Sequence, residues 1–232
     1  MANYVLVHGS FQGAWIWQPT AKILREAGHN VYMPTLDGCG ERSKQIRPGI
    51  TIATQAQEVA DLMFYEDIDD VLLAGTSTGG LVVAKVADLV RDRIKHIFFV
   101  DALAPQPGQK VSDIVQRNPD STPMVTTELT RGPTRVEMMD RLFADLEPEL
   151  RTWAVDRCTM HPLEASDAPG ELDSFWAQEW PATVINCRLS VNPPEAHQRA
   201  TADKLNAAWY ELDAGHYPML SHPAELSKLL LS

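Results

Sequence analysis

The residues best suited to chemistry are a serine flanked by glycines and a histidine near the end of the chain. Gly75-Thr76-Ser77-Thr78-Gly79 fits the pattern Gly-x-Ser-x-Gly, and it stands between an apolar run and a segment of helical period. In a turn of this kind the serine backbone is strained, and the glycines leave room for the crowded strand and helix. The motif therefore predicts Ser77 as a nucleophile. A phosphate-binding glycine turn is the alternative, but the Walker lysine and the Gly-x-Gly-x-x-Gly spacing are both missing.

Of the seven histidines, His216 has the position expected of a general base. It follows the last predicted strand, and it comes after the serine, as in the chain order serine, acid, histidine. A neutral imidazole can take the proton of a serine hydroxyl and return it to a leaving group. The other histidines are better explained as strand, helix-start or packed residues.

Two backbone N–H groups are expected to stabilise a developing oxyanion. Thr78 supplies the first, because it follows the nucleophile at the start of a helix. The loop His8–Gly13 follows the first predicted strand, and by its position in that loop Phe11 supplies the second donor. Removing one such donor typically costs about 3 kcal/mol of transition-state stabilisation.

These residues need a parallel sheet to bring them together. Short apolar, β-branched runs alternate with helical patterns, which predicts an α/β fold with about six mostly parallel strands flanked by helices. A helix is predicted over Thr78–Val90 and a closing helix from about Pro223. The predicted strands are Tyr4–Val7, Asn30–Met33, Val71–Gly75, His96–Asp101, Thr183–Cys187 and Trp209–Leu212.

Residues 103–180 break the alternation with prolines and short amphipathic helices. We interpret them as a helical cap inserted into a single domain spanning residues 1–232, placed over the carboxyl edge of the sheet where a substrate pocket belongs. The cap carries apolar side chains that either line a hydrophobic pocket or pack the cap onto the sheet: Trp153, Trp176, Trp180, Met124, Met138, Met139 and Met160.

Composition excludes several classes of function. The formal net charge of −11 and the scattered basic residues argue against nucleic acid as a partner. No apolar stretch approaches the roughly 18 residues of a membrane-spanning helix, and the N-terminus lacks the pattern of a signal peptide. The three cysteines form no metal or disulfide pattern, so we expect a cytoplasmic protein without a metal or organic cofactor.

Together these segments resemble a group within the α/β-hydrolase superfamily. Val5–Trp15, the motif around Ser77, Val100–Pro105 and Leu212–Ser221 are similar to plant methylesterases, hydroxynitrile lyases and bacterial carboxylesterases. The resemblance covers nearly the whole chain and implies the α/β-hydrolase fold and a serine nucleophile. Hydroxynitrile lyases of this group carry threonine at Gly9 and lysine at Tyr217, so these two departures argue against cyanohydrin cleavage.

The resemblance leaves the triad acid open. The family usually places an aspartate where this chain has Ser190, and no Asp or Glu stands between Cys187 and Glu195. A serine cannot carry the negative charge that stabilises an imidazolium. Asp101, at the end of the strand that follows the nucleophile helix, is our first choice, because some related hydrolases deliver their acid from that position. An alternative for Asp101 is a structural role, and Glu195 and Asp213 are alternative acids.

The expected activity is hydrolysis of a carboxylic ester, lactone or thioester of a small hydrophobic substrate through an acyl-enzyme. An alternative is a protein with a degraded triad that acts as a lyase, as a cyclase or in ligand binding, and Ser190 is the residue that suggests it. A homodimer is a further alternative that the sequence leaves open.

Overall fold

In the computed structural model, which describes residues 1–116, 120–166 and 171–232, the chain is built around a parallel sheet. The strand order is β2-β1-β3-β4-β8-β9, and every neighbouring pair runs parallel. Each of the strands predicted from the apolar runs lies in this sheet, which confirms the predicted fold class. The strands are β1 (Asn3–Val7), β2 (Asn30–Tyr32), β3 (Val71–Ser77), β4 (Ile94–Ala102), β8 (Ala182–Cys187) and β9 (Ala208–Leu212).

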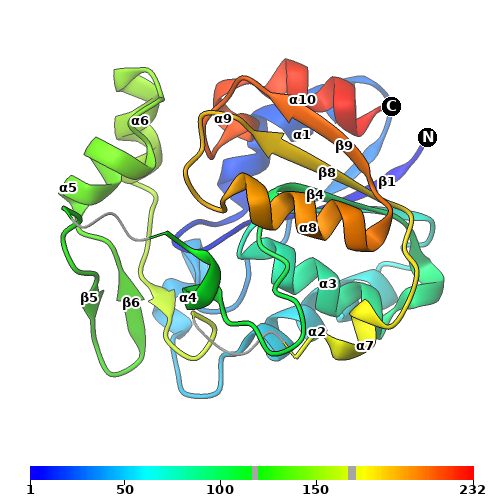
Figure 1. The fold of residues 1–232 in the computed structure, drawn as a ribbon, viewed down its shortest axis with the longest axis horizontal. Coiled ribbons are helices and arrows are strands. Elements are labelled where there is room, and N and C mark those ends of the chain that lie inside the picture. The colour runs from blue at the N-terminus through cyan, green and yellow to red at the C-terminus, as the bar shows by residue number, and fades with distance from the viewer. Residues whose placement is uncertain (117–119, 167–170) are drawn as a thin grey trace.

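Helices cover both faces of the sheet, and each face has its own hydrophobic core (Figure 1). One face carries α1 (Gln18–Glu26), α9 (Pro218–Ser221) and α10 (Pro223–Leu230). The other carries α2 (Ile52–Tyr65), α3 (Gly79–Leu89), α7 (Asp173–Trp176) and α8 (Glu195–Leu205). Burial on both faces explains why the central strands read as continuous apolar runs. Among the described residues, no helix is both long and apolar enough to cross a bilayer.

The segment interpreted as a cap contributes no strand to the main sheet in its described part. Figure 1 shows α7 of this segment beside α3 and the remaining elements gathered at one end of the sheet. They include a small antiparallel sheet that the sequence analysis did not predict, because strands this short carry no recognisable periodicity. The elements are α4 (Val111–Ile114), β5 (Val125–Thr126), β6 (Thr130–Gly132), α5 (Arg135–Glu137), η4 (Met138–Leu142), α6 (Pro148–Val155) and β7 (His161–Pro162).

Two of the tryptophans considered for a substrate pocket belong to the hydrophobic core instead. The indole N–H of Trp176 donates to the carbonyl oxygen of Pro105 at 2.7 Å. Trp180 stacks on Phe175 with ring centroids 5.3 Å apart, and both side chains pack in the core beside α3. Of the two interpretations left open for these tryptophans, the structure favours packing. Short 3₁₀ helices complete the fold: η1 (Ala14–Trp17), η2 (Gly40–Gln45) and η3 (Arg91–Arg93).

Candidate active site

The candidate catalytic residues come from the carboxyl ends of neighbouring strands. Ser77 is the last residue of β3, Asp101 lies near the end of β4, and His216 follows β9. Because all strands of the sheet are parallel, these ends meet at one edge. The loop that contains Phe11 follows β1, and β1 pairs with β3 on the side of β3 opposite β4.

The turn at Ser77 has the strained backbone that its sequence motif predicts. Ser77 has a φ of +53°, in the left-handed region that a residue with a side chain rarely adopts. The helix α3 begins directly after the turn and packs tightly against β1. A Cβ on Gly79 would lie 2.6 Å from the carbonyl oxygen of His8 and 2.9 Å from that of Val7. Only glycine therefore fits at this position, and the half-buried serine stays at the surface of the turn.

The loop after β1 lies directly against Ser77. A Cβ on Gly9 would be 2.6 Å from Ser77 Cβ and 3.2 Å from Ser77 Oγ. Phe11 has a φ of +71°, and its carbonyl oxygen accepts a hydrogen bond from the N–H of Thr159 in the cap at 2.9 Å. The hydroxyls of Ser10 and Thr78 are 2.9 Å apart. The loop is thus tied both to the start of α3 and to the cap, while the oxyanion role of Phe11 and Thr78 stays a prediction.

A bulge in β4 aims Asp101 away from the regular strand direction. The pairing register shifts between Thr76 and Ser77, which face Val100 and Ala102, so Asp101 has no partner on β3. Its φ of +44° is left-handed, a conformation that aspartate tolerates better than most residues. Bulges of this kind commonly redirect a side chain near a functional site.

Asp101 and His216 are in direct contact. Asp101 Oδ2 lies 2.5 Å from Nδ1 of His216, and the carboxylate is completely buried. The other oxygen, Oδ1, accepts hydrogen bonds from Gln198 Nε2 at 2.8 Å and from the N–H of Cys187 at 3.4 Å. A carboxylate accepts only, so Nδ1 of His216 carries its proton toward Asp101. The second ring nitrogen, Nε2, is then left as an acceptor, which is the tautomer that a general base requires.

The other residues considered for the acid have different partners. Ser190 Oγ donates to the carbonyl oxygen of Asn192 at 3.0 Å. Glu195 forms an ion pair with Arg199 at 3.2 Å, and Asp213 forms one with Arg188. The carboxylates of both Glu195 and Asp213 are largely exposed. Among the sequence candidates, Asp101 is therefore the carboxylate that the structure brings to His216.

Two buried histidines near the loop after β1 are held in the neutral form. Desolvation lowers the pKa of His8 to about 4, and its Nε2 accepts the N–H of Leu36 at 3.0 Å. Desolvation likewise lowers the pKa of His161 to about 3, and its ring packs edge-on against Phe11. Both rings therefore help to shape the loop. In the described part of the chain, no group of His, Cys, Asp and Glu is arranged to hold a metal ion.

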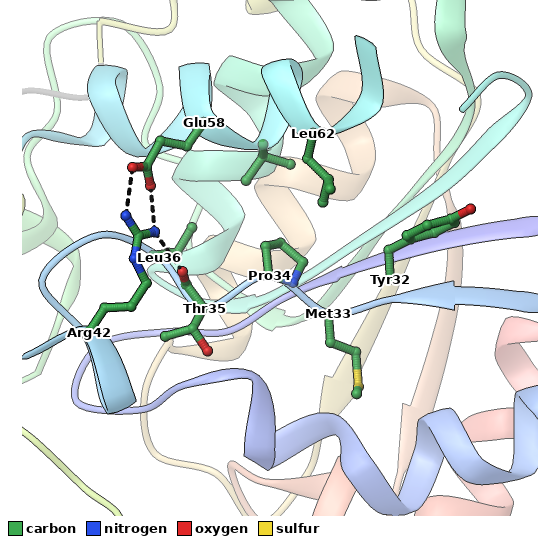
Figure 2. A pocket seen from close by; sticks show the side chains of 9 residues that line it. Tyr32, Met33, Pro34, Thr35, Leu36, Arg42, Glu58 and Leu62 are labelled. Carbon is green, nitrogen blue, oxygen red and sulfur yellow. Dashed lines mark hydrogen bonds and ion pairs between the residues drawn. The ribbon is translucent and has the colours of Figure 1, made fainter. Parts of the chain in front are cut away.

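A surface pocket of about 300 Å³ lies apart from these residues, between the chain that follows β2 and the helix α2. Figure 2 shows apolar side chains along it and an ion pair between Arg42 and Glu58 at one end. None of the candidate catalytic residues contributes to its lining. The lining residues are Tyr32, Met33, Pro34, Thr35, Leu36, Arg42, Glu58, Val59 and Leu62.

The sequence analysis missed the residues that support the site from behind. Gln198 binds Asp101, and Gln12 accepts a hydrogen bond from the N–H of Gly9 at 3.3 Å. A glutamine in a helix or loop has no pattern that sets it apart, so the sequence offered no signal for Gln198. Gln12 lay inside the segment that was singled out, but only coordinates reveal its partner.

Comparisons with known proteins agree with the fold. The model of the alpha/beta hydrolase family matches residues 4–229. A carbendazim hydrolyzing esterase from Nocardioides sp. is 31% identical over 179 residues, which are 73% of each chain. Methylesterase 3 of Arabidopsis thaliana is 26% identical over 99% of this chain and 94% of its own. The solved structure of an extracellular alpha/beta-hydrolase from a Paenibacillus species has a TM-score of 0.83 at 23% identity, covering 100% of this chain and 98% of that one.

Proposed function

This chain belongs to the alpha/beta hydrolase family, and from that premise we propose that it is a serine hydrolase. Its substrate is a carboxylic ester, lactone or thioester of a small hydrophobic molecule, and Ser77, His216 and Asp101 form its catalytic triad. The observation that carries the proposal is the 2.5 Å contact between His216 Nδ1 and the buried carboxylate of Asp101. The left-handed turn at Ser77 supports it.

The proposed reaction has two halves. Nε2 of His216 takes the hydroxyl proton as Ser77 Oγ attacks the carbonyl carbon, and the negative oxygen accepts hydrogen bonds from the N–H groups of Phe11 and Thr78. The bond to the leaving alcohol then breaks, His216 protonates that alcohol, and an acyl group stays on Ser77. Water, deprotonated by His216, attacks the acyl group, and the bond to Ser77 Oγ breaks as His216 returns the proton to that oxygen, which releases the acid and the free serine. Asp101 stabilises the imidazolium in both halves.

The names of the relatives support an ester as the substrate class. One is an esterase that hydrolyses carbendazim and another is a methylesterase. Aromatic and sulfur-containing side chains of the cap also suit an apolar ligand. Trp153 of the cap packs edge-on against Trp15, with ring centroids 5.4 Å apart.

The alternative of a degraded triad loses its main support. It depended on Ser190 at the usual position of the acid. The contact between Asp101 and His216 offers a carboxylate from another strand, so Ser190 no longer favours a lyase, a cyclase or a binding protein over a hydrolase.

A fluorophosphonate probe tests the proposed nucleophile. We expect intact-mass and peptide analysis to find one label, on Ser77, together with hydrolysis of p-nitrophenyl acetate. Ser77→Ala should lose the label and the hydrolysis. The control Ser221→Ala removes a partly buried hydroxyl that bonds to the carbonyl oxygen of Tyr217 and to Nδ1 of His222, and it should keep both the label and the hydrolysis. Folded wild-type protein that stays unlabelled would overturn the proposal.

A further inference from the structure

Two hydroxyl groups meet beside the candidate nucleophile. Ser10 Oγ and Thr78 Oγ1 are 2.9 Å apart, which is a hydrogen bond between residues 68 positions apart in the sequence. Ser10 belongs to the loop that follows β1, and Thr78 lies between Ser77 and the first residue of α3. Ser10 is half-buried, and Thr78 is 9% exposed. The bond therefore joins the two segments that carry the proposed oxyanion donors.

The hydroxyl of Thr78 does not cap the helix that it precedes. A threonine at the start of a helix commonly accepts a hydrogen bond from a backbone N–H of the first turn. Thr78 has no such side-chain bond to α3. In the part of the chain that the structure describes, its hydroxyl bonds to Ser10 instead. The contact that this side chain makes is therefore one with the loop, not one with its own helix.

The peptide group between Ser10 and Phe11, which carries the proposed donor N–H of Phe11, is held from both ends. At the Ser10 end the contact is the hydroxyl of Thr78. At the Phe11 end it is the N–H of Thr159, which donates to the Phe11 carbonyl oxygen at 2.9 Å. Phe11 has a φ of +71°, a conformation that persists only where surrounding contacts impose it. Loss of either contact would therefore let this peptide group turn.

The loop side of the hydroxyl pair lies against the nucleophile. Gly9 directly precedes Ser10, and a Cβ added to Gly9 would be 3.2 Å from Ser77 Oγ. Displacement of reacting groups by about 1 Å can cost on the order of a hundredfold in rate. A small shift of this loop would therefore change the surroundings of the reacting oxygen.

We propose that the hydrogen bond between Ser10 and Thr78 is a clamp that sets the spacing of the two proposed oxyanion donors, the N–H groups of Phe11 and Thr78. Ser10 is a positioning residue, and the hydroxyl of Thr78 has a positioning role separate from that of its N–H. The inference rests on the proposed serine hydrolase function. The oxyanion exists only in the transition state and the tetrahedral intermediate. Loss of the clamp should thus slow the chemical step and leave substrate binding nearly unchanged.

The test is a double-mutant cycle with Ser10→Ala and Thr78→Val, which each remove one hydroxyl and leave the backbone N–H groups in place. Each single variant should lower kcat for p-nitrophenyl acetate by about tenfold, with KM within about twofold. The Ki of a trifluoromethyl ketone, which forms an oxyanion when Ser77 adds to it, should rise by the same factor. The double variant should be no slower than the slower single variant, because both changes remove one bond.

Two further variants distinguish the clamp from a general effect on the fold. Thr78→Ser keeps a hydroxyl at this position and should recover most of the kcat that Thr78→Val loses. Thr183→Val makes the same substitution in another buried threonine, whose Oγ1 lies 2.9 Å from Nε2 of His96. This bond joins β8 and β4 near their first residues, at the edge of the sheet opposite the candidate site. Thr183→Val should lower the melting temperature and keep kcat.

The outcomes separate this inference from the proposed function. Absence of fluorophosphonate labelling in the wild type would overturn the serine hydrolase itself. Normal labelling in the wild type, with kcat of either Ser10→Ala or Thr78→Val within about twofold of it, would overturn only the clamp. Losses that multiply in the double variant, or an equal loss of kcat in Thr183→Val, would also overturn it. Should Thr78→Val not fold, the comparison of Ser10→Ala with Thr183→Val decides.

Discussion

At the scale of single residues, the buried carboxylate of Asp101 explains how the site is completed. A fully buried charge is costly unless hydrogen-bond donors surround it. Asp101 has three such donors, from Gln198, the backbone of Cys187 and the ring of His216. Each donor belongs to a different segment, so this one side chain orients several parts of the sheet edge.

Replacement of Asp101 by asparagine tests the proposed acid. Its amide oxygen can still accept from Gln198, but its NH₂ group then faces Nδ1 of His216 and favours the wrong tautomer of the imidazole. We expect kcat/KM for a p-nitrophenyl ester to fall by at least about a hundredfold in Asp101→Asn. The control Glu195→Gln changes an exposed carboxylate that pairs with Arg199 and should have little effect. Comparable activity in Asp101→Asn and the wild type would remove Asp101 from the mechanism.

At the scale of elements, left-handed residues at two strand ends shape the site. Ser77 ends β3 and Asp101 forms the bulge of β4, and both have a positive φ. The first was predictable, because Gly-x-Ser-x-Gly between an apolar run and a helix is a known turn. The second was predictable only as a position on a strand. A bulge depends on the pairing between strands, and one strand read alone does not contain it.

Tight packing at the first turn of α3 predicts the behaviour of Gly79→Ala. The added Cβ would lie 2.6 Å from a backbone carbonyl oxygen, so α3 must move away from β1. We expect urea unfolding to show a free energy of unfolding lower by more than about 2 kcal/mol. Fluorophosphonate labelling should be lost as well. The control is Gly28→Ala, where φ is +88° but nothing lies within 4 Å of the added Cβ. It should cost only the backbone strain, about 1 kcal/mol, and keep the labelling. Equal effects in the two variants would contradict the packing argument.

The cap marks the limit of what the sequence predicts. The central strands of the main sheet were predictable because burial on both faces makes them continuous apolar runs, and the partly exposed edge strands β2 and β9 were predictable from shorter runs. The pairs of residues that form β5 and β7 are too short to carry a pattern. The roles of Trp176 and Trp180 were equally ambiguous, since an indole packs a core as readily as it lines a pocket. Likewise, Gln198 acquires its role only through Asp101, a partner distant in the sequence.

At the scale of the whole molecule, buried neutral histidines couple stability to pH. The folded-state pKa is about 4 for His8, about 3 for His161 and about 4 for His197, each lowered chiefly by desolvation. In the unfolded chain these rings titrate near their ordinary value of about 6.5. Between these limits the unfolded state binds more protons than the folded state, so stability rises with pH in that window.

We therefore expect the free energy of unfolding to fall by several kcal/mol as the pH drops from about 6.5 to about 4. Urea unfolding followed by circular dichroism at half-unit pH steps measures this slope. His161→Phe removes one of the titrating rings from a site where its Nε2 has no hydrogen-bond partner. That variant should show a shallower slope than the wild type. A wild-type urea midpoint independent of pH across the window would show that the buried rings do not control acid stability.

If β4 supplies the acid, as proposed, the loop that follows β8 does not have to carry a catalytic carboxylate. The hydroxyl of Ser190 in that loop bonds to the carbonyl oxygen of Asn192, and Leu189 and Val191 on either side are 67% and 68% exposed. Side chains at these two positions can therefore vary without a change in the proposed acid. Because the N–H of Leu189 donates to the carbonyl oxygen of Ala214, the backbone of the loop still supports the segment that leads to His216.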